Sequence, residues 1–203
     1  HRDLHSFPTR RSPDPLAAVT RKNKANGLRN PLAQMGEDVS AETVEHSPLV
    51  ADPLRLYDCC PISDGAAAIV IAADDAVKER LSRAGAKAPI RVAATVQTRG
   101  APDVASIKNL LSFEATVEAA RQAYRVSGLS PADIDFVELH DCFSLTEILD
   151  AEDLGVVPRG HAGAWTREGR TRPDGDMPIN VSGGLLAKGH PVGATGVGQL
   201  YEA

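Results

Sequence analysis

The chain has 203 residues, of which 42% are hydrophobic and 24% charged, as is typical of a globular protein with one large core or two smaller ones. A formal net charge of -5 and scattered Lys and Arg residues argue against a nucleic-acid partner. We find no apolar run that is long enough to span a bilayer and expect no secretory leader, which predicts a cytoplasmic protein without a membrane span.

The first third of the chain is rich in polar residues. Residues 1–15 show neither helical nor strand periodicity and resemble translated adaptor sequence, so we expect a disordered or artefactual tail. Residues 16–53 contain few periodic apolar positions and an Asn30-Pro31 turn signal. We therefore predict that this segment is mostly loop, with short helical pieces, over a core formed by other elements.

Strand and helix patterns then alternate. A turn at 63–65 precedes an apolar run, 66–72, that is typical of a fully buried strand. Asp74 is the expected N-cap of a helix that Gly85 closes. Residues 89–98 alternate with a period of two, which predicts a strand with one face inward.

The next elements place a histidine at the end of a strand. Ser112 is predicted to cap a helix that ends near 126, and 130–133 (SPAD) predicts a further helix N-terminus with a reciprocal cap. A short strand over 136–139 then delivers His140, and a helix is expected from Ser144 to about 155.

The last part of the chain begins with a long irregular stretch. Residues 156–178 show no period, so we predict a long loop that covers a site. A brief strand over 179–182 and a break at Gly183-Gly184 follow, and 193–203 is predicted to be helical. The alternation of strands and helices assigns the chain to the α/β class.

The segment 189–196 (GHPVGATG) combines glycines and other small residues, which allow a backbone to pass close to a ligand. A histidine beside a helix N-terminus feels the positive end of the helix dipole, which favours the neutral ring that a general base needs. His190 is therefore a candidate proton acceptor; a glycine-rich turn with a surface histidine is the alternative. The Lys-Ser/Thr ending of a P-loop is missing.

The segment 140–143 (HDCF) is the second candidate, because open α/β sheets place functional groups at the carboxyl ends of their strands. A neutral His140 is able to donate a hydrogen bond to a carbonyl oxygen as charge develops on it, and Asp141 is able to orient a neighbour. The alternative is an N-cap cluster for the helix from Ser144.

The cysteines and the long loop carry weaker signals. The chain contains three cysteines, Cys59, Cys60 and Cys142. Adjacent cysteines form strained disulfides, and no His or Cys lies at ligand spacing from Cys59-Cys60, so we predict free thiols and no metal site. His161, Trp165 and Arg167 are candidates for ligand contact, with a solvated loop as the alternative.

Read in order, the segments 140–143, 180–184 (NVSGG) and 189–196 make the chain similar to the thiolase superfamily. The sequence resembles the branch of sterol-carrier-protein-X-type thiolases and archaeal-type acetyl-CoA acetyltransferases, in which His-Asp replaces Asn-Glu. Three further segments look like that branch, namely 30–34 (NPLAQ), 52–55 (DPLR) and 63–68 (SDGAAA). The likeness covers residues 16–203.

The resemblance implies an incomplete thiolase-like layered α-β-α-β-α fold, in which two α/β halves stack and acyl-CoA binds where they meet. Residues 16–88 would be the end of the N-terminal half with its loop region. Residues 89–203 would be the C-terminal half, truncated before its last strands.

The resemblance also implies an acyltransferase that acts on acyl-CoA or 3-ketoacyl-CoA thioesters, with coenzyme A as substrate or product and no covalently bound cofactor. In this scheme His190 would deprotonate a nucleophilic cysteine, and His140 would help to bind a thioester oxygen. The expected substrate contacts are Gly189, Pro191, Gly193, Ser182, Gly183, Asp141 and Phe143.

The three cysteines of this chain do not lie in the family's two catalytic cysteine motifs, which would fall in regions outside the sequence. We therefore expect no covalent catalysis from this chain alone. Two alternatives remain: a thiolase-like aldolase subunit of steroid side-chain degradation, or a non-catalytic fragment or assembly module. The family further suggests a homo-oligomer for the full-length protein, or a complex with a partner subunit.

Overall fold

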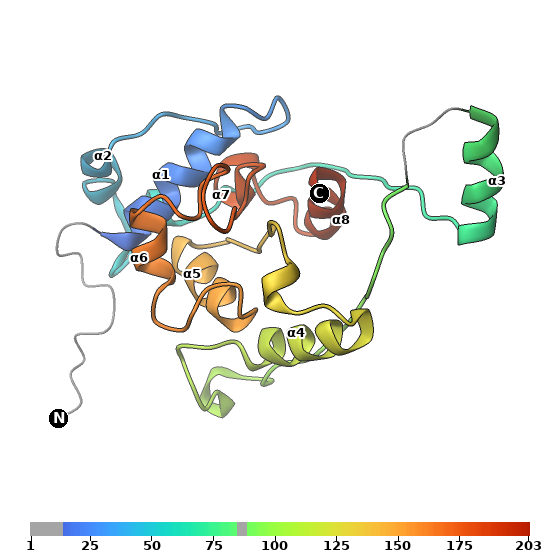
Figure 1. Cartoon of the computed structure of the whole chain (residues 1–203). Helices are drawn as coiled ribbons and strands as arrows, with labels where there is room; N and C mark the ends of the chain where they lie inside the picture. The colour runs from blue at the N-terminus through green and yellow to red at the C-terminus, as the bar shows by residue number, and fades with distance from the viewer. Residues whose placement is uncertain (1–13, 85–88) are drawn as a thin grey trace.

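The computed structural model describes residues 14–84 and 89–203, so most of the predicted tail and the predicted helix end at Gly85 lie outside the described residues. Figure 1 shows a helical body from which α3 projects. In chain order the elements are α1 (Pro15–Gly27), α2 (Ala41–Glu45), β1 (Leu49–Ala51), β2 (Leu54–Arg55), the 3-10 turn η2 (Leu56–Asp58), α3 (Asp74–Ala84), η3 (Val104–Ser106), α4 (Glu114–Ser127), η4 (Pro131–Asp133), α5 (Ser144–Asp153), α6 (Ala162–Arg167), α7 (Gly184–Lys188) and α8 (Thr195–Glu202).

Helix α1 packs against α2, α5, α6 and α7. It begins inside the predicted tail, because the Asp14 side chain caps it by accepting from the Leu16 amide at 2.8 Å and Pro15 occupies its first turn. The prediction of mostly loop over 16–53 was wrong at this helix. The buried face of α1 is largely polar, so the sequence shows no helical spacing of apolar residues here. The buried polar residues are Thr20, Lys22, Asn23, Lys24 and Asn26.

The larger hydrophobic core lies between α5, α6 and the segments that flank them. It is formed by Leu139, Ala151, Val156, Val157, Ala162, Met177 and Ile179. Residues 156–178 therefore do not form a long covering loop: they contain α6 and supply core side chains. The apolar positions of this stretch are too far apart in sequence to show a period, although the fold brings them together.

The short strands around the candidate histidines form isolated bridges rather than a wide sheet. Val137 pairs with Ile179 in parallel, as its amide donates to the Pro178 carbonyl at 3.0 Å and its carbonyl accepts from the Asn180 amide at 2.9 Å. The predicted strands at 136–139 and 179–182 are thus adjacent. β1 and β2 form a two-stranded antiparallel sheet with Leu49 opposite Arg55.

The predicted helices in the second half are present with small differences at their ends. The predicted reciprocal cap at Ser130 and Asp133 is confirmed, but it starts the 3-10 turn η4 rather than a longer helix. Phe113, not Ser112, occupies the N-cap of α4, because the Ser112 hydroxyl donates instead to Asp153 on α5. The predicted helix starts at Asp74 and Ser144 lie within α3 and α5.

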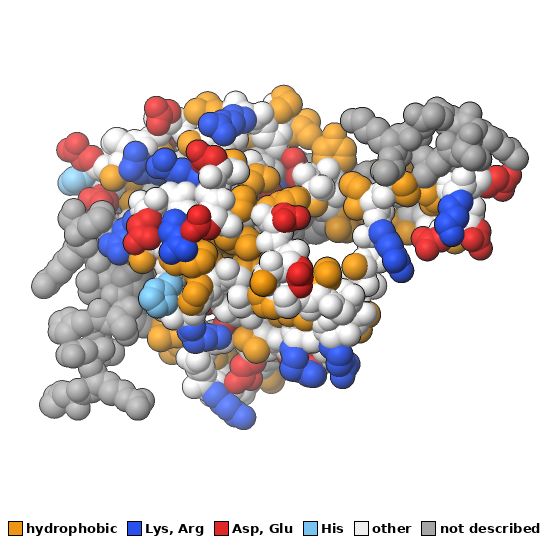
Figure 2. Space-filling model, in the orientation of Figure 1, with side chains coloured by type: hydrophobic (Ala, Val, Ile, Leu, Met, Phe, Trp, Pro, Cys, Tyr) orange, Lys and Arg blue, Asp and Glu red, His pale blue; other side chains and the backbone are white. Residues whose placement is uncertain are grey.

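Residues 64–73, α3 and residues 89–98 form an arm that leaves the body and returns to it (Figure 1). The prediction that 66–72 is a fully buried strand was wrong: Val70 is 98% exposed and Ile71 77% exposed. No described segment pairs with this run, so its apolar side chains stay in contact with solvent. Figure 2 shows hydrophobic side chains along the part of the arm that joins α3 to the body.

The alternating segment 89–98 is likewise extended but unpaired among the described residues, with Ile90 and Val92 exposed. Across residues 14–84 and 89–203, none of the helices combines the length and the apolar character needed to cross a membrane.

Candidate active site

The two candidate histidines lie together. The ring centroids of His140 and His190 are 4.8 Å apart, and the ring planes cross at 82° in an edge-to-face contact. His140 is exposed and His190 is half-buried. Two segments that are distant in sequence therefore meet in one small imidazole pair at the surface of the body.

His190 follows α7 and is fixed by the backbone on both sides. Its amide donates to the Pro61 carbonyl at 3.0 Å, and it forms a parallel bridge with Ile62. Gly189 supplies the sharp exit from α7, with φ 95° and ψ 168°, a conformation that suits only glycine. A Cβ at Gly189 would also collide with the Ser63 hydroxyl, so the strand-like segment 61–63 lies directly against the loop.

The hydroxyl of Thr195, in the first turn of α8, is a hydrogen-bond partner of the His190 ring. Thr195 Oγ1 donates to the Pro191 carbonyl at 3.2 Å and lies 2.8 Å from His190 Nδ1. A hydroxyl has one hydrogen to donate, so while it donates to Pro191 it accepts from Nδ1–H, and Nε2 keeps its lone pair. In that tautomer, Nε2 of the neutral ring is available as a proton acceptor.

The pKa of His190 lies below its ordinary value of 6.5, mainly because burial disfavours the charged ring and secondly because a charged His140 would repel it. The direction is the one expected from the sequence. Burial and the second histidine are two causes that the sequence did not indicate.

His140 stands at the end of the short strand that pairs with Ile179. The Leu139 amide before it donates to Asn180 Oδ1 at 2.7 Å, and the Leu139 carbonyl accepts from Gln199 Nε2 of α8 at 2.8 Å. After the turn, the Ser144 hydroxyl donates to Asp58 Oδ1 at 2.8 Å. The backbone that carries His140 is thus held by three other parts of the chain.

The segment 59–62 connects the two histidine-bearing loops. The Cys60 amide donates to the Cys142 carbonyl at 2.9 Å, and Cys59 bridges Phe143 in antiparallel fashion. All three cysteines are free, as predicted. Burial, with the nearby Cys142 thiol as the next cause, raises the pKa of the Cys60 thiol to about 11, which makes it a poor nucleophile at neutral pH.

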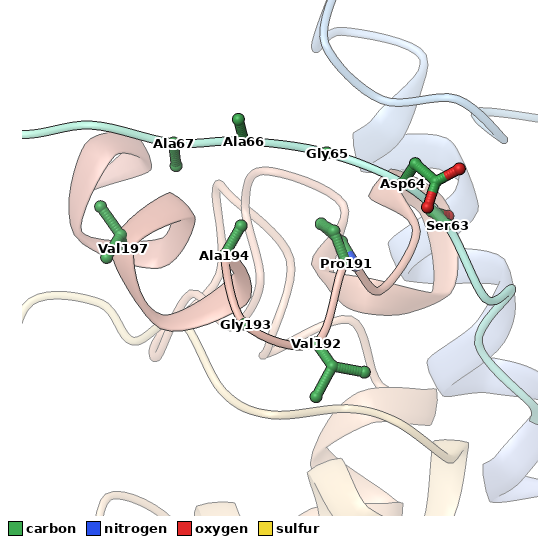
Figure 3. Close-up of a pocket in the computed structure, with 10 residues that line it drawn as sticks. All are labelled: Ser63, Asp64, Gly65, Ala66, Ala67, Pro191, Val192, Gly193, Ala194 and Val197. Carbon is green, nitrogen blue, oxygen red and sulfur yellow. The ribbon is translucent and has the colours of Figure 1, made fainter.

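An open cleft of about 470 Å³ lies between the arm and the glycine-rich loop (Figure 3). Its lining residues are Ser63, Asp64, Gly65, Ala66, Ala67, Pro191, Val192, Gly193, Ala194 and Val197. A Cβ at Gly65 would lie 2.9 Å from Pro191 Cγ, so the missing side chain allows the arm to pass over the loop. The 63–68 and 189–196 segments therefore form the two walls of one cleft.

The expected substrate contacts divide into two groups. Pro191 and Gly193 line the cleft and Phe143 is exposed, so substrate contact remains a prediction for them. Gly189 is buried against Ser63 and is not among the lining residues, and its contact with substrate likewise stays a prediction. Asp141 and Ser182 are instead buried, and their side chains bond to protein groups. The Ser182 hydroxyl donates to Glu138 Oε2 at 2.6 Å, and Asp141 accepts from backbone amides of α7.

Buried Gly183 likewise packs on α1, where an added Cβ would lie 2.8 Å from the Gly27 Cα. Asp141, Ser182 and Gly183 thus contact other parts of the protein in this structure, and their contact with a substrate stays a prediction.

Sequence reasoning missed the buried residues that support this layer, namely Lys22, Asn23 and Glu147. Glu147 lies seven positions after His140 on the inward face of α5, a position where an acidic residue among apolar ones was the available signal. His161, Trp165 and Arg167 lie at or in α6 and outside the cleft lining, and Trp165 is covered by the Arg170 guanidinium, 3.5 Å from the ring centroid.

Comparison with known protein families identifies the family of this chain. The model of the family "Thiolase C-terminal domain-like" matches residues 97–203, which include both histidines. The chain belongs to the thiolase family, as its motifs predicted.

Individual relatives are longer than this chain. It is 45% identical over 201 residues to the acetyl-CoA acetyltransferase of Methanothermobacter thermautotrophicus, covering 99% of this chain and 51% of that protein. It is 37% identical over 196 residues to the benzoylsuccinyl-CoA thiolase subunit BbsB of Thauera aromatica, covering 97% and 50%. Human sterol carrier protein 2 is 38% identical over 187 residues, covering 92% and 34%.

The chain therefore spans about half the length, or less, of these relatives. Among solved structures, the Ltp2-ChsH2(DUF35) aldolase superposes with a TM-score of 0.75 at 21% identity, over 93% of this chain and 49% of the other. That likeness concerns the fold, and it confirms the predicted incomplete thiolase-like α/β architecture.

Proposed function

We propose that this chain supplies the histidine base and an oxyanion contact to a thiolase-type acyltransferase that acts on acyl-CoA or 3-ketoacyl-CoA thioesters. The observation that carries the proposal is the edge-to-face pair of His140 and His190 next to a glycine-lined cleft. The names of the thiolase and acetyl-CoA acetyltransferase relatives support the reaction class. The glycine-rich wall provides the room that a thioester needs.

In this proposal Nε2 of His190 takes the proton of a cysteine thiol, because its Nδ1 is occupied by Thr195. On an acyl-CoA, the resulting thiolate attacks the thioester carbonyl, and coenzyme A leaves as its thiol with the proton held by His190. On a 3-ketoacyl-CoA, the thiolate attacks the 3-keto carbon, the C2–C3 bond breaks, acetyl-CoA leaves after protonation at C2, and added coenzyme A takes the acyl group from the cysteine. His140 donates to the oxygen on which negative charge develops. The proposal places the nucleophilic thiol outside the described residues, because burial keeps Cys60 protonated and the three cysteines of this chain do not lie in the family's catalytic cysteine motifs.

The test uses the full-length protein that carries this sequence, with CoA-dependent cleavage of a 3-ketoacyl-CoA as the assay. His190→Ala should lower kcat/KM by roughly 10²- to 10⁴-fold, which is the usual contribution of a general base. His161→Ala, at the N-cap of α6, is the matched control and should retain activity. Full activity in His190→Ala would refute the proposal, and absence of CoA binding by calorimetry would favour a non-catalytic assembly module.

A second candidate keeps the fold and changes the reaction. The structural similarity to the Ltp2-ChsH2(DUF35) aldolase favours an aldolase that cleaves a carbon–carbon bond and works with a partner subunit. The names of that complex and of the BbsB subunit both indicate proteins that assemble with others. Product formation without added coenzyme A, and only in the presence of a second subunit, would select this candidate over acyl transfer.

A further inference from the structure

A buried polar cluster lies beneath the histidine pair and joins α1, α5 and α7. Asn23 Nδ2 donates to Asp141 Oδ2 at 2.8 Å and to Glu147 Oε2 at 2.7 Å, so one amide group connects two carboxylates. Lys22 Nζ lies 2.7 Å from Glu147 Oε1, and Asn180 Nδ2 donates to Glu147 Oε2 at 2.8 Å. All five side chains are almost completely buried.

Asp141 links the two segments that carry the histidines. It is the residue after His140, and its Oδ1 accepts from the Leu185 amide at 2.6 Å while its Oδ2 accepts from the Leu186 amide at 3.3 Å. Those amides lie in the first turn of α7. The C-cap residue of this helix, Gly189, directly precedes His190. Gly184 allows this approach, since a Cβ there would overlap the Asp141 carboxylate.

The cluster retains features that cost stability. It buries two acidic side chains against one lysine, and Asn23 Oδ1 is buried without a hydrogen-bond partner among the described residues. An unpaired buried acceptor of this kind lowers stability, because its contact with water is lost and not replaced. Asn23 turns its amide nitrogen towards both carboxylates and so holds Asp141 in position. Its own amide oxygen is then left without a hydrogen-bond donor.

We propose that Asp141, held by Asn23, is a positioning residue that sets the separation of His140 and His190. Because Asp141 is attached to His140 and fastens the helix that leads to His190, any shift of its carboxylate changes the distance between the two rings. The catalytic role of this positioning rests on the proposed function, in which both histidines act on one substrate. The geometric claim itself is measurable in this chain without a substrate.

The test compares Asn23→Ala with Thr20→Val, a control one turn earlier on α1, where a buried hydroxyl donates to the Tyr57 carbonyl and does not reach either histidine. Ring proton contacts between His140 and His190, and the ring pKa of His190, are measured by NMR. Asn23→Ala should lose the ring–ring cross-peak and raise the His190 pKa, because the charge of His140 moves away. Thr20→Val should change neither, although it also removes a buried hydrogen bond.

If Asn23→Ala does not fold, Asn23→Ser keeps the helix and a donor that reaches one carboxylate at most, and the same two signals are read. An unchanged cross-peak and pKa in a folded Asn23 variant would overturn the inference. In the full-length protein the same variant should lower kcat by roughly ten- to a hundredfold with little change in KM, as expected when catalytic groups are misplaced. A His190→Ala enzyme with full activity would refute the proposed function and leave the NMR result standing.

Discussion

His140 and His190 meet edge to face, with 4.8 Å between their ring centroids, so a charge on His140 acts directly on the ring of His190. Burial and a charged His140 together hold the pKa of His190 below 6.5. A neutral His190 is therefore favoured, because charging it next to a charged His140 would bring two positive charges together.

Replacing His140 should therefore raise the pKa of its neighbour. In His140→Ala, one of the two causes of the lowered His190 pKa is removed and the burial remains, so the pKa should move towards 6.5 without an increase beyond it. Titration of the His190 ring by NMR measures this. His161→Ala, which alters a histidine at the N-cap of α6, should leave the titration unchanged; a shift of equal size in that variant would contradict an effect of the ring pair.

Two glycines of the same loop should differ sharply in their tolerance of alanine. Gly189 has a positive φ of 95°, and its Cβ would collide with the Ser63 hydroxyl, so Gly189→Ala should lower the free energy of unfolding by about 1–3 kcal/mol. At Gly193 a Cβ meets nothing within 4 Å, so Gly193→Ala should change the free energy by about 0.5 kcal/mol or less. Denaturant unfolding measures both, and equal losses would rule out the described exit from α7.

A charged side chain should cost little stability in the segment of the arm where the sequence predicts a buried strand. Val70 is 98% exposed, so Val70→Lys should alter the free energy of unfolding of this chain by no more than about 0.5 kcal/mol. Leu186 in α7 is 1% exposed, and Leu186→Ala should cost about 2–5 kcal/mol. Chemical denaturation compares the two. A loss of several kcal/mol in Val70→Lys would mean that the arm is packed in solution.

The same arm shows why part of the fold could not be predicted from the sequence. A continuous apolar run such as 66–72 indicates a strand that is covered on both faces, and the pattern contains no information about where the covering elements come from. Here no described segment supplies them, and the run remains exposed. Helices with an apolar face, by contrast, were predictable, as the match of α3, α4 and α5 to their expected ranges shows.

Helix α1 and the layer beneath the histidines escaped prediction for the opposite reason. Their buried positions carry Lys22, Asn23 and Glu147, residues that are normally exposed, so no apolar period marks them. Such groups enter a core only when partners from distant segments satisfy them, and those partners are visible only in the fold. His140 and His190 were predictable because glycines and strand ends mark their loops. Their contact was not, since it depends on this polar layer.

The buried ion pair in that layer should be sensitive to the loss of one partner. Lys22 Nζ lies 2.7 Å from Glu147 Oε1, and both side chains are nearly inaccessible. Lys22→Met leaves a buried carboxylate without its countercharge and should cost about 3–5 kcal/mol of unfolding free energy. The double variant Lys22→Met/Glu147→Gln should recover part of that loss, because the remaining group is neutral. A double variant that is less stable than Lys22→Met would contradict the charge argument.

Asp141 should give the chain a distinct dependence of stability on pH. Burial, with the Glu147 carboxylate as the second cause, raises the pKa of the Asp141 carboxyl from 3.8 to about 7. Between these two values the folded chain binds the proton more tightly than the unfolded chain does, so the contribution of this group to stability is complete below pH 3.8 and declines as the pH rises to about 7.

Asp141→Asn removes this titration. Relative to the variant, the wild-type chain should therefore lose unfolding free energy steadily as the pH increases from about 4 to 7, measured by denaturant unfolding at fixed ionic strength. Asp133→Asn is the control, because hydrogen bonds from Ser130 lower the pKa of the exposed Asp133 carboxyl below 3.8, so its contribution to stability changes only below about pH 4 and the difference between wild type and Asp133→Asn should stay nearly constant from pH 4 to 7. A stability difference between wild type and Asp141→Asn that stays constant over this range would show that Asp141 is ionised throughout, and that the buried cluster carries both negative charges.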